Sequence, residues 1–117
     1  MPRVSTLLDE ACEAYMKRNM LSKQLYDSSH AHLPGGNTRT VLHATPYPLV
    51  FESAKKATLM SVDGDSYTDF LNEYSAGIFG HSNSRIFNTL NETLSKGWNF
   101  GGHNLYEKRF AAKVVER

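Results

Sequence analysis

Arg39 and Tyr74 are the side chains whose types and settings suit recognition of a small charged ligand. Arg39 lies in a polar loop shortly after Pro34-Gly35-Gly36. A guanidinium offers parallel N–H donors that match a carboxylate or a phosphate; the alternative is an ordinary solvated loop arginine. Tyr74 precedes the small residues Ser75-Ala76-Gly77, which let backbone approach a ligand closely; simple packing is the alternative. The double glycine is not a P-loop, because no Gly-Lys-Ser or Gly-Lys-Thr follows it.

The other reactive side chains do not form a catalytic or metal-binding set. Cys12 is the single cysteine, which excludes an intrachain disulfide and a cysteine metal site. Of the five histidines only His30 and His32 lie close together, without the spacing or the carboxylates of a metal site. Lys55 and Lys56 lie in a polar turn, which lacks the burial that helps a catalytic lysine lose its proton. We therefore predict no catalytic residue and no metal ligand in this chain.

The elements that must position Arg39 and Tyr74 follow from the hydrophobic pattern. Apolar residues recur at helical spacing over residues 4–29, and Ser5 can cap the start of that helix. The Pro-Gly-Gly segment ends it. A short strand is expected over residues 48–53, and a hairpin over residues 57–71 turns at Asp63-Gly64. This hairpin leads directly into the bend that carries Tyr74.

Two further helices are expected after this bend. The first covers residues 84–96, with Asn83 or Ser84 as its cap, and the second runs from residue 105 to the end. The second has no residue that closes a helix, so we expect the chain to be part of a larger fold. The predicted fold is α+β: an N-terminal helix, a small antiparallel β-meander and two further helices. Its expected parts are residues 1–32, 33–81 and 82–117.

Composition narrows the class of protein. The 117 residues suffice for one small domain, and 40% hydrophobic with 21% charged residues is typical of a globular chain. The net charge of +1 gives no electrostatic reason to expect nucleic acid as a partner. No apolar run approaches the ~20 residues that span a bilayer, and the acidic N-terminal region fits no targeting signal. We expect a cytoplasmic protein without a membrane partner.

Four segments together resemble one enzyme family. They are Leu33-Pro-Gly-Gly-Asn-Thr-Arg39, Val62-Asp-Gly-Asp-Ser-Tyr-Thr-Asp-Phe70, Gly77-Ile-Phe-Gly-His81 and Asn99-Phe-Gly-Gly-His103. Their order and spacing resemble the N-terminal part of class III pyridoxal-phosphate aminotransferases, in the branch with glutamate-1-semialdehyde aminomutase and the β-phenylalanine aminotransferases. The resemblance covers residues 20–117.

The resemblance implies roles for both candidate residues. Arg39 matches the arginine that binds the carboxylate of a small amino-acid substrate, and Tyr74 matches an aromatic wall of the pocket. Family members act as homodimers, with this region near the dimer interface. The aminomutase branch more often has Ser-Pro-Val-Arg and a tryptophan at these places, so Asn37-Thr38-Arg39 and Tyr74 favour the aminotransferase branch.

The family's cofactor-binding residues lie in a region that follows these segments. Its phosphate-binding loop, its pyridine-facing aspartate and its Schiff-base lysine have no counterpart in this sequence. The resemblance therefore implies pyridoxal phosphate in the full-length enzyme, with no covalent attachment to this chain and no activity of the chain alone. We interpret the chain as an N-terminal fragment of an aminotransferase. The alternatives are a fragment of a glutamate-1-semialdehyde aminomutase and a non-catalytic module that binds a full-length aminotransferase.

Overall fold

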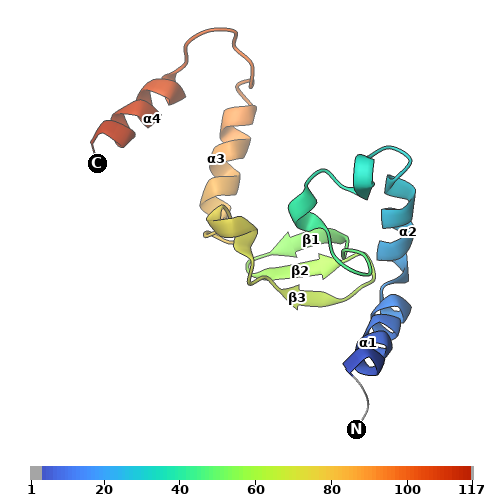
Figure 1. Cartoon of the computed structure of the whole chain (residues 1–117). Coiled ribbons are helices and arrows are strands. Elements are labelled where there is room, and N and C mark those ends of the chain that lie inside the picture. Colours follow the sequence, from blue (N-terminus) through green and yellow to red (C-terminus); the bar gives the residue numbers. More distant parts are fainter. Residues whose placement is uncertain (1–3, 117) are drawn as a thin grey trace. The chain divides into compact units, whose positions relative to one another are not determined.

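The computed structural model describes residues 4–116, which form an α+β fold (Figure 1). The helices are α1 (Val4–Arg18), α2 (Met20–Ser29), α3 (Ser84–Leu94) and α4 (Leu105–Val115). The strands are β1 (Phe51–Lys55), β2 (Thr58–Ser61) and β3 (Ser66–Thr68). Short 3-10 helices cover Pro34–Gly36, Thr40–Leu42 and Asn72–Ser75. A boundary between Ser82 and Asn83 divides the chain into two compact units. The predicted fold class is confirmed.

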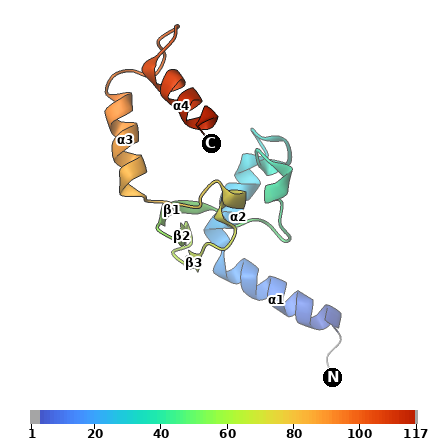
Figure 2. The same cartoon turned by 90° about the vertical axis from the view of Figure 1, so that its left-hand side faces the viewer.

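The helix predicted over residues 4–29 forms as two helices, because the backbone leaves the helical region at Asn19. This residue has φ −116° and ψ 49°, and its side-chain Nδ2 donates to the carbonyl of Tyr15 at 2.9 Å. Such local bonds from asparagine compete with helix continuation. Figure 2 shows α1 and α2 as separate helices; Asn19 is the residue between their bounds. Ser5 lies inside α1 rather than ahead of it, so its predicted capping role is wrong.

The turn of the predicted hairpin caps α2 from a distance in sequence. The Asp63 carboxylate accepts hydrogen bonds from the Leu21 N–H at 2.8 Å, the Ser22 N–H at 3.3 Å and the Ser22 hydroxyl. The first amides of a helix have no partner within the helix and carry its positive dipole end, so a carboxylate there is stabilising. Next to it, Asp65 accepts two hydrogen bonds from Arg18 at 2.6 and 2.7 Å, which lowers the pKa of Asp65. The hairpin turn thus holds both N-terminal helices.

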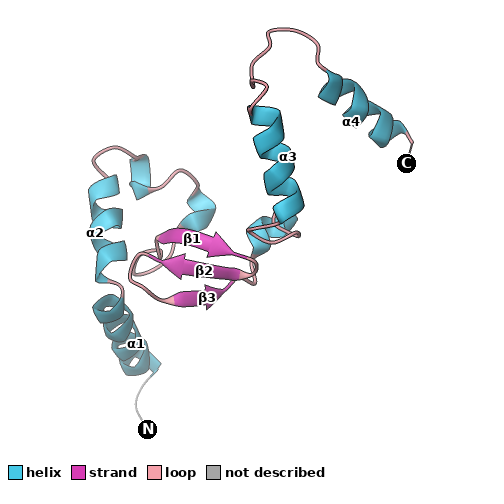
Figure 3. Ribbon diagram, turned by 180° about the vertical axis from the view of Figure 1, so that it is seen from behind, coloured by secondary structure: helices cyan, strands magenta, loops and turns pink. Residues whose placement is uncertain are grey.

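The three strands form an antiparallel meander in the order β1-β2-β3, as Figure 3 shows. Strands β2 and β3 pair as predicted, with Leu59 opposite Tyr67. The Ser61 N–H donates to the Asp65 carbonyl at 2.9 Å and closes a three-residue loop, residues 62–64, whose third residue Gly64 has the left-handed φ of +88° that this position favours. The strand predicted over residues 48–53 forms later in the chain, at Phe51–Lys55, because its start is set by pairing with β2.

Burial in the described residues centres on Tyr47 rather than on an aliphatic core. Tyr47 is the one hydrophobic side chain there that is buried, and its ring lies 5.2 Å from that of Tyr15. Burial raises the pKa of both tyrosine hydroxyls. The hydroxyl of Tyr15 donates to the Tyr47 carbonyl at 2.8 Å, and the hydroxyl of Tyr47 lies 3.1 Å from the carbonyl of Asn19. These bonds satisfy the polar ends that burial would otherwise penalise.

The second unit consists of two capped helices. Asn83 accepts hydrogen bonds from the first amides of α3 at 3.1 Å, which confirms its predicted capping role. Asn104 forms a capping box with Glu107 at the start of α4. The apolar residues Phe87, Leu90 and Leu94 of α3 are all more than half exposed. Among residues 4–116, no helix has the combination of length and hydropathy that crossing a membrane requires.

Candidate functional site

The Pro-Gly-Gly-Asn segment fixes the backbone that presents Arg39. Gly35 and Gly36 both have φ +70°, the left-handed region that favours glycine. A Cβ on Gly36 would lie 2.6 Å from Cε1 of His30, so a larger residue requires that ring to move. The Asn37 side-chain oxygen accepts a hydrogen bond from the Arg39 N–H at 3.1 Å, a turn typical of asparagine. Local sequence therefore determines where the Arg39 side chain leaves the backbone.

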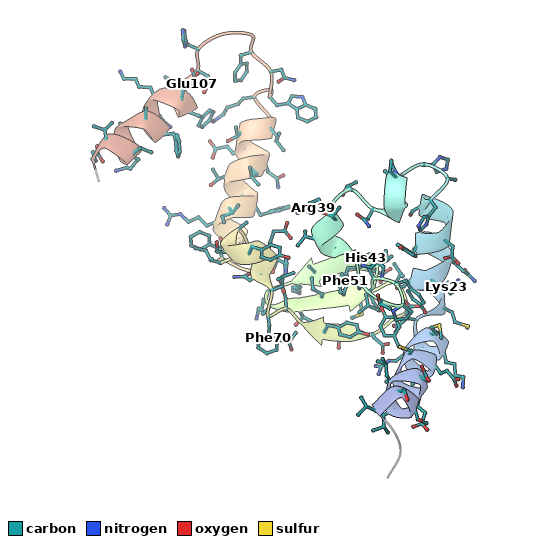
Figure 4. The ribbon with its side chains drawn as sticks, viewed as in Figure 1. Lys23, Arg39, His43, Phe51, Phe70 and Glu107 are labelled. Carbon is teal, nitrogen blue, oxygen red and sulfur yellow. The ribbon has the colours of Figure 1, made fainter. Side chains whose placement is uncertain are left out.

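The Arg39 side chain reaches a carboxylate 34 residues further along the chain. Its Nη1 donates to Oε1 of Glu73 at 2.7 Å, and Figure 4 shows Arg39 extending from its loop. Both side chains remain about half exposed, at 55% for Arg39 and 51% for Glu73. The hydrogen bond to Glu73 raises the pKa of the guanidinium, which stays protonated. Both charged groups of the pair are therefore partly open to solvent in this chain.

Glu73 lies in a turn of unusual backbone conformation. Asn72, Glu73, Tyr74 and Ser75 have φ of 51°, 46°, 53° and 85°, so four successive non-glycine residues are left-handed. Each such residue costs roughly 1–2 kcal/mol relative to the right-handed region. Strain of this kind persists where surrounding contacts enforce it and is concentrated at functional sites. The turn is therefore a candidate for a functional role.

Asp69 supplies contacts that hold this turn. Its Oδ1 accepts hydrogen bonds from the N–H groups of Leu71 and Asn72, both at 2.9 Å. Its Oδ2 lies 2.7 Å from Nε2 of His81, which ties the start of the bend to its end. The Asp69 side chain is only 7% exposed. The bond from the Asn72 amide and the bond to His81 lower the pKa of Asp69, so it is a carboxylate at neutral pH.

The structure brings together the two segments that the sequence singled out, and the direct contact is made by a residue that sequence reasoning missed. Tyr74 is 57% exposed and belongs to the same left-handed turn as Glu73. No spacing rule indicates that Glu73 pairs with Arg39. Asp69 did carry a signal in the sequence. The side chain of an aspartate commonly accepts a hydrogen bond from the backbone N–H two residues later, and this favours a turn.

The described lysines lack the setting of a nucleophilic amine. All seven lysines of the chain are exposed. Lys23 bonds to Asp27 on α2, and Lys96, just beyond the end of α3, bonds to Glu92 of that helix; these bonds raise the pKa of both amines. A lysine that forms a Schiff base needs a lowered pKa, which burial or a cationic neighbour provides. Lys23 and Lys96 therefore lack that setting. Among residues 4–116, no three His, Cys, Asp or Glu side chains gather as metal ligands would.

The chain is similar over almost its whole length to known aminotransferases. It is 35% identical over 114 residues to the β-phenylalanine transaminase of Variovorax paradoxus, a match that covers 97% of this chain and 26% of the relative. It is 35% identical over 96 residues to the glutamate-1-semialdehyde 2,1-aminomutase of Methanosphaera stadtmanae, covering 82% and 23%. The chain thus spans about a quarter of the length of the curated relatives it matches. No family model matches it.

Solved structures give the same result. The β-phenylalanine aminotransferase from Variovorax paradoxus superposes with a TM-score of 0.93 at 34% identity, over 97% of this chain and 26% of that one. A transaminase with pyridoxal phosphate bound superposes with a TM-score of 0.76 at 31% identity, over 80% and 22%. The expected similarity to the N-terminal part of pyridoxal-phosphate aminotransferases is therefore confirmed, together with the identity of the family's cofactor.

Proposed function

We propose that this chain, which matches the N-terminal region of class III pyridoxal-phosphate aminotransferases, forms one wall of the substrate pocket of such an enzyme. The reaction is the transfer of an amino group between an amino acid and an oxo acid. The observation that carries the proposal is the placement of Arg39. A loop built from Gly35, Gly36 and Asn37 presents its guanidinium to solvent, beside the strained turn that carries Tyr74.

Arg39 has donors available for a substrate carboxylate. A guanidinium carries five N–H donors; among the described residues, Nη1 is the one nitrogen of the Arg39 guanidinium that has a hydrogen-bond partner. Two parallel bonds from the remaining edge would fix the orientation of a carboxylate, and so direct the substrate's amino group toward the cofactor. Tyr74 would line the same pocket through its exposed ring. Pyridoxal phosphate, held by the rest of the enzyme, supplies the amino-transfer chemistry.

The residues beside Arg39 bear on the choice between aminotransferase and aminomutase. Asn37-Thr38 precedes the arginine, and the Asn37 side chain holds the Arg39 backbone at 3.1 Å. With Tyr74 as the aromatic, this arrangement supports an aminotransferase with a small amino-acid substrate. We infer that the complete enzyme is a homodimer, as the family resemblance implies.

The proposal is tested by the reading frame beyond Arg117 and by expression of the complete protein with pyridoxal phosphate. We expect the frame to continue into a Ser-Gly-Thr segment and a later lysine, and the purified protein to show a Schiff-base absorption band and amino transfer. The 117-residue chain, expressed alone as the matched control, should show no such band. A stop codon directly after Arg117 with unrelated flanking sequence would contradict the proposal.

A non-catalytic module is the second candidate, favoured by one observation. The α3 residues Phe87, Leu90 and Leu94 form an exposed apolar face that a partner would cover. In this case the free chain would bind a full-length aminotransferase. Co-purification of the tagged chain with such an enzyme, lost on Leu90→Asp, would support the module. A monomeric, well-folded chain that retains no aminotransferase would count against it.

A further inference from the structure

The Arg39 guanidinium is already paired with a carboxylate of the same chain. Glu73 Oε1 accepts from Arg39 Nη1 at 2.7 Å, and both side chains are about half exposed. A substrate carboxylate that approaches Arg39 therefore meets a guanidinium that already bonds to one carboxylate. The negative charge of Glu73 lies beside it and repels the substrate's own negative charge. Coulomb repulsion between the two carboxylates opposes binding, although solvent screens part of it.

We propose that Glu73 is a specificity-determining residue, whose carboxylate competes with the substrate carboxylate for Arg39. This inference rests on the proposed function, because it takes Arg39 as the carboxylate-binding residue. A substrate binds either by displacing Glu73 or by taking the remaining edge of the guanidinium against its charge. In both cases Glu73 weakens the binding of carboxylate-bearing substrates. An amine without a carboxylate does not compete for Arg39 and escapes this penalty.

The conformation of the turn keeps Glu73 in place for this role. Glu73 has φ 46° within the left-handed run from Asn72 to Ser75, so its side chain leaves the backbone in a direction that an ordinary helical turn would not give. Asp69 bonds to the Asn72 amide at the start of this run. The Gly77 N–H donates to the Asn72 carbonyl at 3.1 Å and closes it. The competing carboxylate is thus held near Arg39 by a bonded and strained turn rather than by a flexible loop.

The test uses the complete enzyme loaded with pyridoxal phosphate and the variant Glu73→Gln. The amide retains the shape and an acceptor oxygen but removes the charge. Two amino donors are compared: β-phenylalanine, for which the Variovorax paradoxus relative is named and which we take as the test substrate, and 1-phenylethylamine, which has the phenyl ring and the amino group but no carboxylate. We expect KM for β-phenylalanine to fall by about two- to fivefold, the range of an exposed ion pair, with kcat little changed. For 1-phenylethylamine, KM and kcat should stay at the wild-type values.

Controls separate competition from a merely structural effect. Glu92→Gln removes another exposed carboxylate, which is paired with Lys96 at 2.9 Å, and should leave both KM values unchanged. The difference between wild type and Glu73→Gln should shrink in high salt, because the competing charges are exposed. Glu73→Ala removes the competing group completely and should lower KM for β-phenylalanine as well. If Glu73→Gln folds poorly, Glu73→Ala tests the competition for Arg39 in its place.

The outcomes distinguish this inference from the function on which it rests. If the wild-type enzyme transaminates neither donor, the proposed function fails; if Arg39→Ala leaves KM for β-phenylalanine unchanged, the role proposed for Arg39 fails. If Arg39→Ala raises KM but removal of the Glu73 charge leaves it unchanged or raises it, only the competition by Glu73 is overturned. An equal change for both amino donors would likewise overturn it, since that would indicate general damage to the pocket.

Discussion

Asp63→Ala should unfold α2 far more readily than its place in a surface turn suggests. The variant removes the carboxylate that accepts from the Leu21 amide, the Ser22 amide and the Ser22 hydroxyl. Leu21 is half exposed, so water can replace its lost bond. Ser22 is 0% exposed, and its groups would be left without that partner. Loss of a helix cap costs about 1 kcal/mol and an unsatisfied buried group about 1–3 kcal/mol. We therefore expect a loss of about 2–4 kcal/mol.

The assay is urea unfolding of the chain, followed by far-ultraviolet circular dichroism. Asp63→Asn keeps one acceptor oxygen without the charge and should give an intermediate loss. Asp27→Ala is the matched control, because among residues 4–116 the Asp27 side chain pairs with Lys23 alone, on the exposed side of the same helix. A loss for Asp63→Ala no greater than that of Asp27→Ala would refute the reasoning that the hairpin turn caps α2.

Two further predictions concern the bend that carries Tyr74. Gly80→Ala should destabilise the chain more than Gly64→Ala, although both glycines have positive φ. A Cβ at Gly80 would lie 2.9 Å from a backbone carbonyl oxygen, whereas Gly64 has open space around it. Thermal melts of the two variants measure this, and equal losses would contradict it. The Asn72 amide and then His81 lower the pKa of Asp69, so its stabilising effect is present above the unfolded pKa of about 3.9 and is lost as the pH falls through the folded value. Asp69→Asn should therefore reduce the difference in urea midpoint between pH 6 and pH 3; an unchanged difference would argue against this role.

Much of the fold follows from local sequence signals. The Asp63-Gly64 turn, flanked by β-branched and aromatic residues, predicted the β2–β3 hairpin, and Asn83 predicted the start of α3. These features depend on a few neighbouring residues, whose preferences the sequence displays directly. The break at Asn19 is different. It combines the local Asn19 side-chain bond with distant contacts: the Tyr47 hydroxyl donates to the backbone carbonyl of the buried Asn19, and a turn more than 40 residues away caps α2.

The candidate site shows the same division. Arg39 and Tyr74 were candidates from their neighbours in sequence, with a solvated arginine and simple packing as the alternatives, and their roles were implied only by the family resemblance. Glu73 was missed because its importance comes from a left-handed backbone that non-glycine residues rarely adopt. The contact between Arg39 and Glu73 joins segments 34 residues apart. Pairing of this kind is set by tertiary structure, and the neighbours of Arg39 and Glu73 in the sequence do not predict it.

The central claim is that Arg39 binds the substrate carboxylate, and the most direct measurement compares Arg39→Ala, Arg39→Lys and wild type in the complete enzyme. With β-phenylalanine, we expect KM to rise by at least about tenfold for alanine, which removes the charge-assisted bonds, and by less for lysine, which keeps the charge but loses the planar fork. With 1-phenylethylamine, neither variant should change KM by more than about twofold. Arg85→Ala is a control on α3 and should give the wild-type KM with both donors. Equal KM values for wild type and Arg39→Ala with β-phenylalanine would contradict the claim.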